Sequence, residues 1–323
     1  MKNPASKFSR LAWGALIYNV LVILFGAFVR ATGSGAGCGA HWPLCNGVII
    51  PRPERIETVI EFTHRLTSGI TLPLVIILVW LAWKIFPRTS LVPKSAALAL
   101  FFTITEALVG AGLVLFQLVE DNDSIARALS MIIHLVNTFL LTGSLALTAW
   151  WAAAGEPDKI RVRGLSAILV LAGAAAMLVL GASGAVTALG DTLFPARSLA
   201  EALREDFSPA AHYLIQLRVY HPAIAVSTGV YLFLSTAWIR RRANNERIEF
   251  FASSLFILYL LQLVIGIVNV ALLAPVWMQI VHLLVTNLIW ITFVLMTGEV
   301  LGRFSVSLVH QAVDQPIQAV PRE

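Results

Sequence analysis

Charged residues are scarce in this 323-residue sequence, and their scarcity excludes an ordinary soluble domain. Lys, Arg, Asp and Glu make up 13% of the chain, against about 25% in typical globular proteins. Hydrophobic residues make up 58%, and the mean hydropathy is +0.81. We therefore expect most of the chain to lie within a lipid bilayer, with little sequence left for a soluble domain.

Long polar stretches are also lacking, and eight apolar runs are long enough to span a membrane. A spanning helix needs roughly 20 consecutive, mostly apolar residues. The expected spans are residues 11–31, 58–86, 95–119, 125–152, 164–189, 212–239, 249–273 and 276–301. The sequence thus predicts an all-α membrane protein with eight transmembrane helices.

The net charge of +5 does not indicate a nucleic-acid partner, because the basic residues are distributed among short loops. Fifteen of the 23 Lys and Arg residues fall on one side of the predicted membrane: Lys2, Lys7, Arg10, Lys84, Arg88, Lys94, Lys159, Arg161, Arg163, Arg240, Arg241, Arg242, Arg247, Arg303 and Arg322. The positive-inside rule then places both termini in the cytoplasm and the first, third, fifth and seventh loops outside.

The N-terminal segment lacks a signal-peptide cleavage site and the features of an organelle transit peptide. Residues 1–10 contain three basic residues but lead directly into an apolar run that is too long for a signal sequence. We expect a retained first helix and a location in a bacterial plasma membrane rather than a mitochondrial inner membrane.

Cysteine is nearly absent, and the two cysteines present both lie in the first outward loop. Cys38 and Cys45 would face an oxidising compartment with this topology, which favours a disulfide bond between them. The pair is either a structural clip on a glycine-rich loop or a redox-active pair, because exposed disulfides can be labile. The sequence leaves both interpretations open.

The second half of the sequence repeats features of the first half at a nearly constant offset. The run GAFVRATGSG begins at Gly26, and GASGAVTALG begins at Gly181, 155 residues later. The other matches are His64 with His221, Glu106 with Gln262 and His134 with His282, at offsets of 157, 156 and 148. We predict two four-helix bundles, residues 1–155 and 156–323, related by a pseudo-two-fold axis along the membrane normal.

Four of the seven histidines lie inside predicted spans, each near the outward end: His64, His134, His221 and His282. Their distances from the helix starts correspond to a depth of roughly 9 to 15 Å. A single histidine of this kind could equally be a hydrogen-bonded core residue or a ligand. Two histidines per bundle at one depth, however, indicate axial ligands of haem iron. The remaining histidines, His41, His212 and His310, receive no role.

Other metal ligands are few within the spans, which argues against a zinc site or a metal pump. Glu61 and Glu106 are the candidate carboxylates. Glu106, deep in the third span, is either a proton relay or a hydrogen-bonded contact between helices. Four arginines near the outer helix ends either pair with haem propionates or extend to lipid headgroups: Arg30, Arg65, Arg127 and Arg218.

The two bundles differ beside their first histidines. Glu61 precedes His64 by three residues on one helix face, whereas the matching position before His221 is Arg218. With this difference, the site beside Glu61 could host proton-coupled oxidation, and the site beside Arg218 could carry electrons. Arg218 would contact the electron-carrying haem. An acid favoured at a helix N-terminus is the simpler alternative for Glu61.

Taken together, these motifs resemble the haem A synthases of bacteria and mitochondria. The resemblance covers nearly all of the chain and rests on residues 26–35, the loop from Cys38 to Gly47, the run Glu61-Phe-Thr-His64-Arg65, and His134, His221 and His282. Some relatives have a second cysteine pair in the third outward loop, and this chain lacks it.

The resemblance implies a protein that oxidises the C8 methyl group of haem O to the formyl group of haem A. It implies that His221 and His282 ligate a haem b cofactor in the C-terminal half. His64 and His134 would line the substrate haem O site in the N-terminal half as ligands of its iron, and Glu61 would be the essential acid there. Candidate partners are haem O synthase, a quinol or another electron acceptor, membrane lipid and further copies of the chain.

Two other functional classes remain open: a non-catalytic membrane cytochrome b that passes electrons between quinol and a partner, and a transporter with parallel repeats that uses histidines for protons. For a synthase, iron with two imidazole ligands has no open position for dioxygen. Either one histidine dissociates, or water supplies the oxygen and the electrons leave to an acceptor. We favour the second route, with Glu61 as a base or as a group that stabilises a developing cation.

Overall fold

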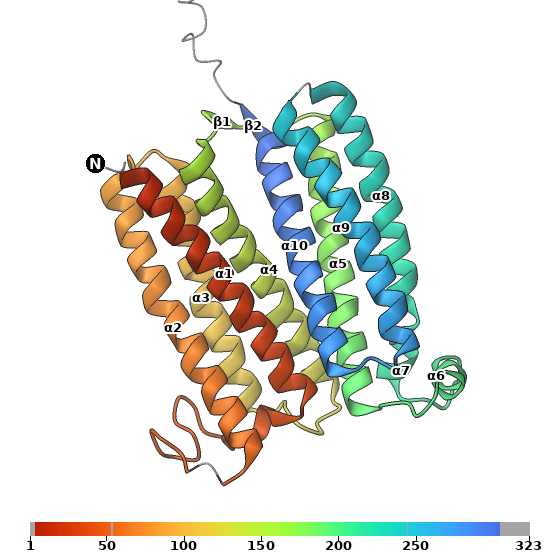
Figure 1. Ribbon diagram of the computed structural model, residues 1–323. Coiled ribbons are helices and arrows are strands. Elements are labelled where there is room, and N and C mark those ends of the chain that lie inside the picture. The colour runs from red at the N-terminus through yellow and green to blue at the C-terminus, as the bar shows by residue number, and fades with distance from the viewer. Residues whose placement is uncertain (1–3, 53, 244, 304–323) are drawn as a thin grey trace, which may run out of the picture.

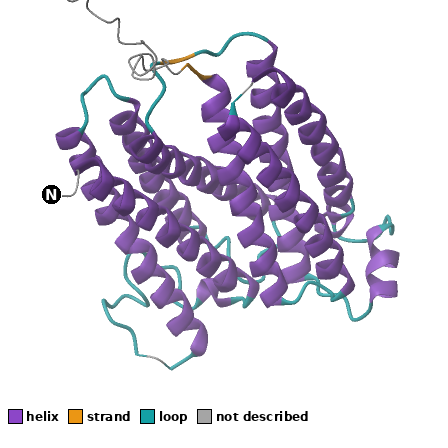
Figure 2. Ribbon diagram, turned by 45° about the horizontal axis from the view of Figure 1, so that its top comes forward, coloured by secondary structure: helices purple, strands orange, loops and turns teal. Residues whose placement is uncertain are grey.

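The computed structural model describes residues 4–52, 54–243 and 245–303, and these residues are mostly helical (Figures 1 and 2). The long helices are α1 (Pro4–Ala31), α2 (Ile56–Ile85), α3 (Leu91–Leu115), α4 (Ile125–Ala154), α5 (Leu165–Leu193), α8 (Tyr220–Ala243), α9 (Glu246–Ala271) and α10 (Val276–Leu301). The short elements are the 3₁₀ helix η1 (Ser34–Ala36), α6 (Leu199–Asp206), α7 (Tyr213–Arg218), and the antiparallel pair β1 (Lys159–Ile160) and β2 (Gly302–Arg303). Lys2, His310 and Arg322 lie outside the described residues.

Eight helical segments among the described residues are long and apolar enough to cross a membrane, with α7 and α8 counted as one segment from Tyr213 to Ala243. This confirms the prediction of an all-α, multi-pass membrane protein with eight candidate spans. The predicted first span began at residue 11, but α1 begins at Pro4. The extra turns are polar, so a search for apolar runs alone does not include them.

Capping side chains set the true starts of several helices. Ser90 accepts a hydrogen bond from the backbone N–H of Val92, so α3 begins four residues before the predicted span at residue 95. Ser124 caps α4 in the same way, and Asn245 caps α9. Such caps satisfy backbone N–H groups that the first helical turn leaves without partners.

The sixth predicted span is broken just before His221. α7 ends at Arg218 and α8 begins at Tyr220, so the expected continuous helix over 212–239 is wrong at this point. Pro222 explains the break, because proline has no N–H to donate to the carbonyl group of Arg218 and is tolerated only in a first helical turn. The break places His221 at the start of α8.

The long helices form two side-by-side groups, α1–α4 and α5 with α8–α10 (Figure 1). Within the first group, α4 packs against α1 and α3; within the second, α9 packs against α10 and α5 against α8. The groups meet where α4 contacts α5 and α10, and where α1 contacts α10.

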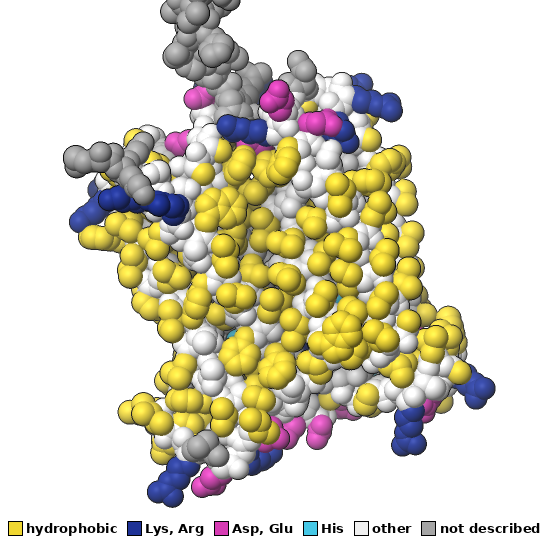
Figure 3. Space-filling model, in the orientation of Figure 1, with side chains coloured by type: hydrophobic (Ala, Val, Ile, Leu, Met, Phe, Trp, Pro, Cys, Tyr) yellow, Lys and Arg dark blue, Asp and Glu magenta, His cyan; other side chains and the backbone are white. Residues whose placement is uncertain are grey.

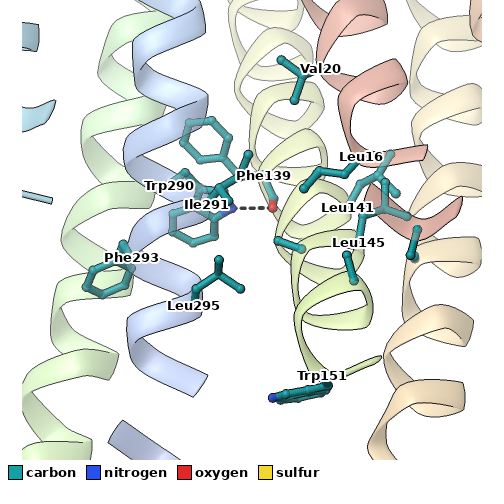
Figure 4. Packing of buried hydrophobic residues seen from close by; sticks show 14 of the residues in the cluster. Leu16, Val20, Phe139, Leu141, Leu145, Trp151, Trp290, Ile291, Phe293 and Leu295 are labelled. Carbon is teal, nitrogen blue, oxygen red and sulfur yellow. Dashed lines mark hydrogen bonds between the residues drawn. The ribbon is translucent and has the colours of Figure 1, made fainter. Parts of the chain in front are cut away.

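Aromatic side chains fill the centre of this interface (Figure 4). The rings of Phe139 in α4 and Trp290 in α10 are stacked, with centroids 5.2 Å apart. The indole Nε1 of Trp290 donates a 2.6 Å hydrogen bond to the carbonyl oxygen of Phe139. Both side chains are buried, so this contact combines apolar packing with a satisfied indole N–H.

Polar contacts join the two groups at both ends of the interface. Arg30 of α1 donates to the hydroxyl of Thr192 in α5 (2.5 Å) and to the Oε1 of Gln279 in α10 (2.8 Å). At the other end, Trp150 Nε1 of α4 donates to Glu299 Oε1 of α10 at 2.8 Å. These contacts fix how the two helix groups lie relative to each other.

The outer surface suits a lipid environment. Figure 3 shows apolar side chains over the middle of the visible face and charged side chains mainly at its two ends. Large apolar residues such as Trp83, Phe250 and Ile267 are 62%, 65% and 70% exposed. Soluble proteins rarely expose contiguous apolar surface of this extent, whereas lipid tails cover it.

Candidate functional site

His221 and His282 face each other in the second helix group. His221 lies at the start of α8, His282 lies in the second turn of α10, and their ring centroids are 6.5 Å apart with planes inclined at 63°. One metal ion bound between two imidazole nitrogens at about 2.0–2.1 Å requires centroids about 6.3 Å apart. The observed spacing therefore fits a single iron between the two rings, as in haem with two histidine ligands.

Contacts from α5 hold the ring of His221. The Ser183 hydroxyl lies 2.9 Å from His221 Nδ1, which engages this nitrogen and leaves Nε2 for a metal. A Cβ at Gly184 would lie 3.1 Å from the ring, so glycine lets α5 approach closely. Ser183 lies inside the repeated run that begins at Gly181, and this repeat is the signal in the sequence that could have identified it.

The ring of His282 has a buried nitrogen without a protein partner. Its Nδ1 is buried and makes no hydrogen bond with the described residues. Gln262 instead donates to the backbone carbonyl of His282 at 3.0 Å and to the Thr286 hydroxyl at 2.7 Å. Buried polar atoms normally have partners, so this unpaired nitrogen fits a histidine whose ring binds a group other than protein.

His64 and His134 lie in the first helix group but do not meet as closely. His64 of α2 packs edge-on against Phe25 of α1, with centroids 5.5 Å apart. His134 of α4 places its Nδ1 3.4 Å from Glu106 Oε1. No ring contact joins His64 and His134 within the described residues, although the two side chains are close enough to interact electrostatically. The structure thus brings the second pair, but not the first, into ring contact.

Glu61 is buried and bound to the loop that precedes α2. Its Oε2 accepts a 2.7 Å hydrogen bond from the backbone N–H of Cys38, and its Oε1 accepts two from Arg65, at 3.1 and 2.5 Å. Arg65 also donates to the carbonyl oxygens of His41 and Leu44. Glu61 therefore anchors the loop, a function that the sequence alone did not suggest.

The anchored loop is closed by the Cys38–Cys45 disulfide bond, as predicted. Both cysteines are buried, at 0% and 1% exposure. Gly37 packs directly on the first turn of α2, where a Cβ would lie only 2.4 Å from the backbone of Glu57. The disulfide, Gly37 and Glu61 together hold the loop against the end of α2 that contains His64.

Arg218 is paired with two carboxylates. Its Nε donates to Asp206 at the end of α6, and its Nη1 lies 3.3 Å from Asp191 Oδ1 at the end of α5. Asp191 directly follows the repeated run, which is the signal that could have identified it. Because these acids engage the guanidinium, a direct contact between Arg218 and a propionate stays a prediction.

The other three arginines that the sequence placed near helix ends also donate to protein oxygens. Arg30 bridges the two helix groups, Arg65 binds Glu61, and Arg127 donates to the carbonyls of Glu120 and Asn122. Their guanidinium groups are therefore engaged by protein oxygens at these helix ends.

Comparison with known proteins identifies the family. The family model COX15-CtaA, described as a cytochrome oxidase assembly protein, matches residues 9–294. The chain is 30% identical over 270 residues to a Staphylococcus carnosus protein named heme A synthase, covering 80% of this chain and 84% of that protein.

A second similarity is to a longer protein. The chain is 51% identical over 304 residues to a Thermus thermophilus protein named protoheme IX farnesyltransferase, covering 94% of this chain but 50% of that protein. The chain thus spans about half the length of the Thermus proteins it matches. The match of the family model over most of the sequence shows that the chain belongs to the COX15-CtaA family of cytochrome oxidase assembly proteins.

Proposed function

We propose that this chain is a haem A synthase, which oxidises the C8 methyl group of haem O to the formyl group of haem A. The observation that supports this most directly is the 6.5 Å spacing of the His221 and His282 rings in a chain of this family. The name of the Staphylococcus relative supports the same activity.

The C-terminal half is proposed to hold haem b between His221 and His282. The bound haem supplies one-electron redox chemistry to the site. Ser183 orients the His221 ring, and Gly184 and Gly266 leave room for the two imidazoles between neighbouring helices. Arg218 is proposed to contribute at the outer end of this site, where it is held by Asp191 and Asp206.

The N-terminal half is proposed to bind the substrate haem O, with His64 and His134 beside its iron. In each of two rounds a C–H bond of the methyl carbon is replaced by a C–O bond to a water oxygen, with release of two protons and two electrons, and the resulting geminal diol loses water to leave the aldehyde. Glu61 is proposed as the acid of this site, one helical turn from His64. Its hydrogen bonds to Cys38 and Arg65 fix the carboxylate in place before reaction.

Residues 1–155 and 156–323 are proposed as equivalent halves related by a pseudo-two-fold axis, with both termini in the cytoplasm. Matching contacts support this: Thr138 donates to the carbonyl of His134, and Thr286 donates to that of His282, at the same offset of 148 residues. A bacterial plasma membrane is the proposed location.

A protohaem farnesyltransferase is the proposed source of the substrate. The relatives from Thermus bear that name and are matched over only half their length, which supports association of the two activities. A quinone or another acceptor is proposed to take the electrons.

Pigment analysis tests the activity. The chain is expressed in a host that makes haem O but no haem A, and extracted haems are separated by chromatography. We expect haem A with the intact chain and none with an empty vector. A purified protein that retains haem yet forms no haem A in this host would support the non-catalytic cytochrome b instead.

A further inference from the structure

A polar cluster surrounds Glu106 within the first helix group. Glu106 Oε2 accepts a 2.5 Å hydrogen bond from Asn137 Nδ2, and Oε1 accepts one from the Thr138 hydroxyl. The same Oε1 lies 3.4 Å from His134 Nδ1. That imidazole nitrogen is buried and makes no hydrogen bond with the described residues, so Glu106 faces it at ion-pair distance rather than as a hydrogen-bond partner. Glu106 is thus the group that faces it.

The matching position in the second helix group makes different contacts. Gln262 donates its amide to the carbonyl of His282 and to Thr286, and it leaves His282 Nδ1 without a partner. The first group therefore has a carboxylate facing the ring of its α4 histidine. The second group has an amide that binds the backbone of its α10 histidine instead.

A carboxylate beside Nδ1 has a defined effect on a histidine that binds iron. It can accept a hydrogen bond from Nδ1–H, which fixes the tautomer in which Nε2 is free for the metal, holds the ring orientation and raises the basicity of the ligand. Loss of such a partner typically lowers metal affinity or activity by about 10–100-fold.

We propose that Glu106 is a positioning residue that orients His134 toward the substrate iron and makes it a stronger ligand than His282 is toward haem b. This inference rests on the proposed function, because it takes His134 as an iron ligand. Its consequence is an inequality between the two sites: the iron in the N-terminal half has the lower reduction potential of the two, because a more basic ligand stabilises ferric iron.

A purely structural Glu106 would only join α3 to α4 through Asn137 and Thr138. Thr138→Val separates the two roles, because it removes the hydroxyl's hydrogen bonds to Glu106 and to the carbonyl oxygen of His134 but leaves the Glu106 carboxylate and the His134 ring in place. Glu106→Gln keeps the side-chain size but replaces the carboxylate. Glutamine is already accommodated at the matching position, Gln262, so this variant is expected to fold.

The experiment uses the full chain purified from a host that makes haem O. Redox titration followed by visible absorbance and low-temperature electron paramagnetic resonance measure both haem components in the parent, Glu106→Gln and Thr138→Val. We expect Glu106→Gln to raise the potential of one component, change its resonance and weaken its retention by about 10–100-fold. The component bound by His221 and His282 should stay unchanged, which also shows that the variant is folded. Thr138→Val should leave both potentials as in the parent.

Two results would overturn the inference while leaving the proposed function intact. The first is an unchanged potential and resonance in Glu106→Gln when both haem components are present. The second is an equal shift in Thr138→Val, which would assign Glu106 a structural role. A purified parent chain without haem in either half would instead overturn the proposed function itself.

Discussion

The imidazole rings of His221 and His282 lie 6.5 Å apart, centroid to centroid. They belong to α8 and α10, two helices of the same helix group (Figure 1). The spacing depends on the break before His221, which starts α8 at Tyr220. A shift by one residue would rotate His221 by about 100° around its helix. Pro222 thus contributes to the site by fixing where α8 begins.

Removing either ring of this pair should strongly lower the haem b content. His221→Ala and His282→Ala each leave one imidazole, so we expect at least about a tenfold loss of bound haem b. Absorbance of the purified protein and pyridine haemochrome analysis measure the content. His212→Ala is the matched control, because His212 caps α7 and lies outside both pairs. Equal haem content in the control and in His282→Ala would contradict the assignment.

Ser183 should tune the same site without being a ligand. Ser183→Ala removes the contact to His221 Nδ1, so the ring loses its fixed tautomer and orientation. We expect a measurable shift in the potential of haem b and about tenfold weaker retention. Ser144→Ala is the control, since this hydroxyl only donates to the carbonyl of Leu140 within α4. A haem b potential identical to that of the control would remove Ser183 from the site.

The sequence predicted the eight spans well, because apolar runs of membrane length are a local property. It placed the start of α3 too late, because Ser90 caps that helix through a side-chain contact that hydropathy does not measure. It missed α6 altogether, because this eight-residue helix has no apolar run of membrane length. Pro222 could have indicated the helix break before His221, but the break lies within a continuous apolar run and was not predicted.

The candidate histidines were also found from sequence, because their repetition at one depth is unusual. The distances between their rings could not be predicted from sequence, because they depend on how the helices pack. The contact of Glu299 was not predicted either: it lies near the C-terminal end of α10, and its buried carboxylate accepts a hydrogen bond from Trp150 of α4. Only the tertiary structure shows that these residues meet.

Arg30 should stabilise the association of the two helix groups. Arg30→Ala removes hydrogen bonds to Thr192 and Gln279 and leaves their oxygens with fewer partners. We expect a loss of about 1.5–3 kcal/mol, because hydrogen bonds to charged groups contribute that much. Thermal unfolding in detergent measures it. Arg55→Ala, which removes an exposed ion pair with Glu57, should change stability by less than about 1 kcal/mol. A similar loss in both variants would contradict a bridging role for Arg30.

Glu61 should be required for haem A formation while haem binding persists. Glu61→Ala removes the acid beside His64 and also the acceptor for the Cys38 N–H and for Arg65. The proposed haem b ligands, His221 and His282, lie in the other helix group, so we expect the absorbance of bound haem to remain, whereas haem A in pigment extracts should fall to the level of an empty vector. Glu57→Ala is the matched control, because Glu57 is one turn earlier in α2 and forms an ion pair with exposed Arg55.

A second variant separates the chemistry of Glu61 from its anchoring of the loop. Arg65→Ala leaves the carboxylate but removes the hydrogen bonds from Arg65 to the carbonyls of His41 and Leu44. Limited proteolysis reports loosening of the loop in both variants. If Glu61 acts in the reaction, Arg65→Ala retains more haem A formation than Glu61→Ala at equal loosening. Equal losses in both variants would leave Glu61 only the anchoring function, and normal haem A in Glu61→Ala would exclude it from the mechanism.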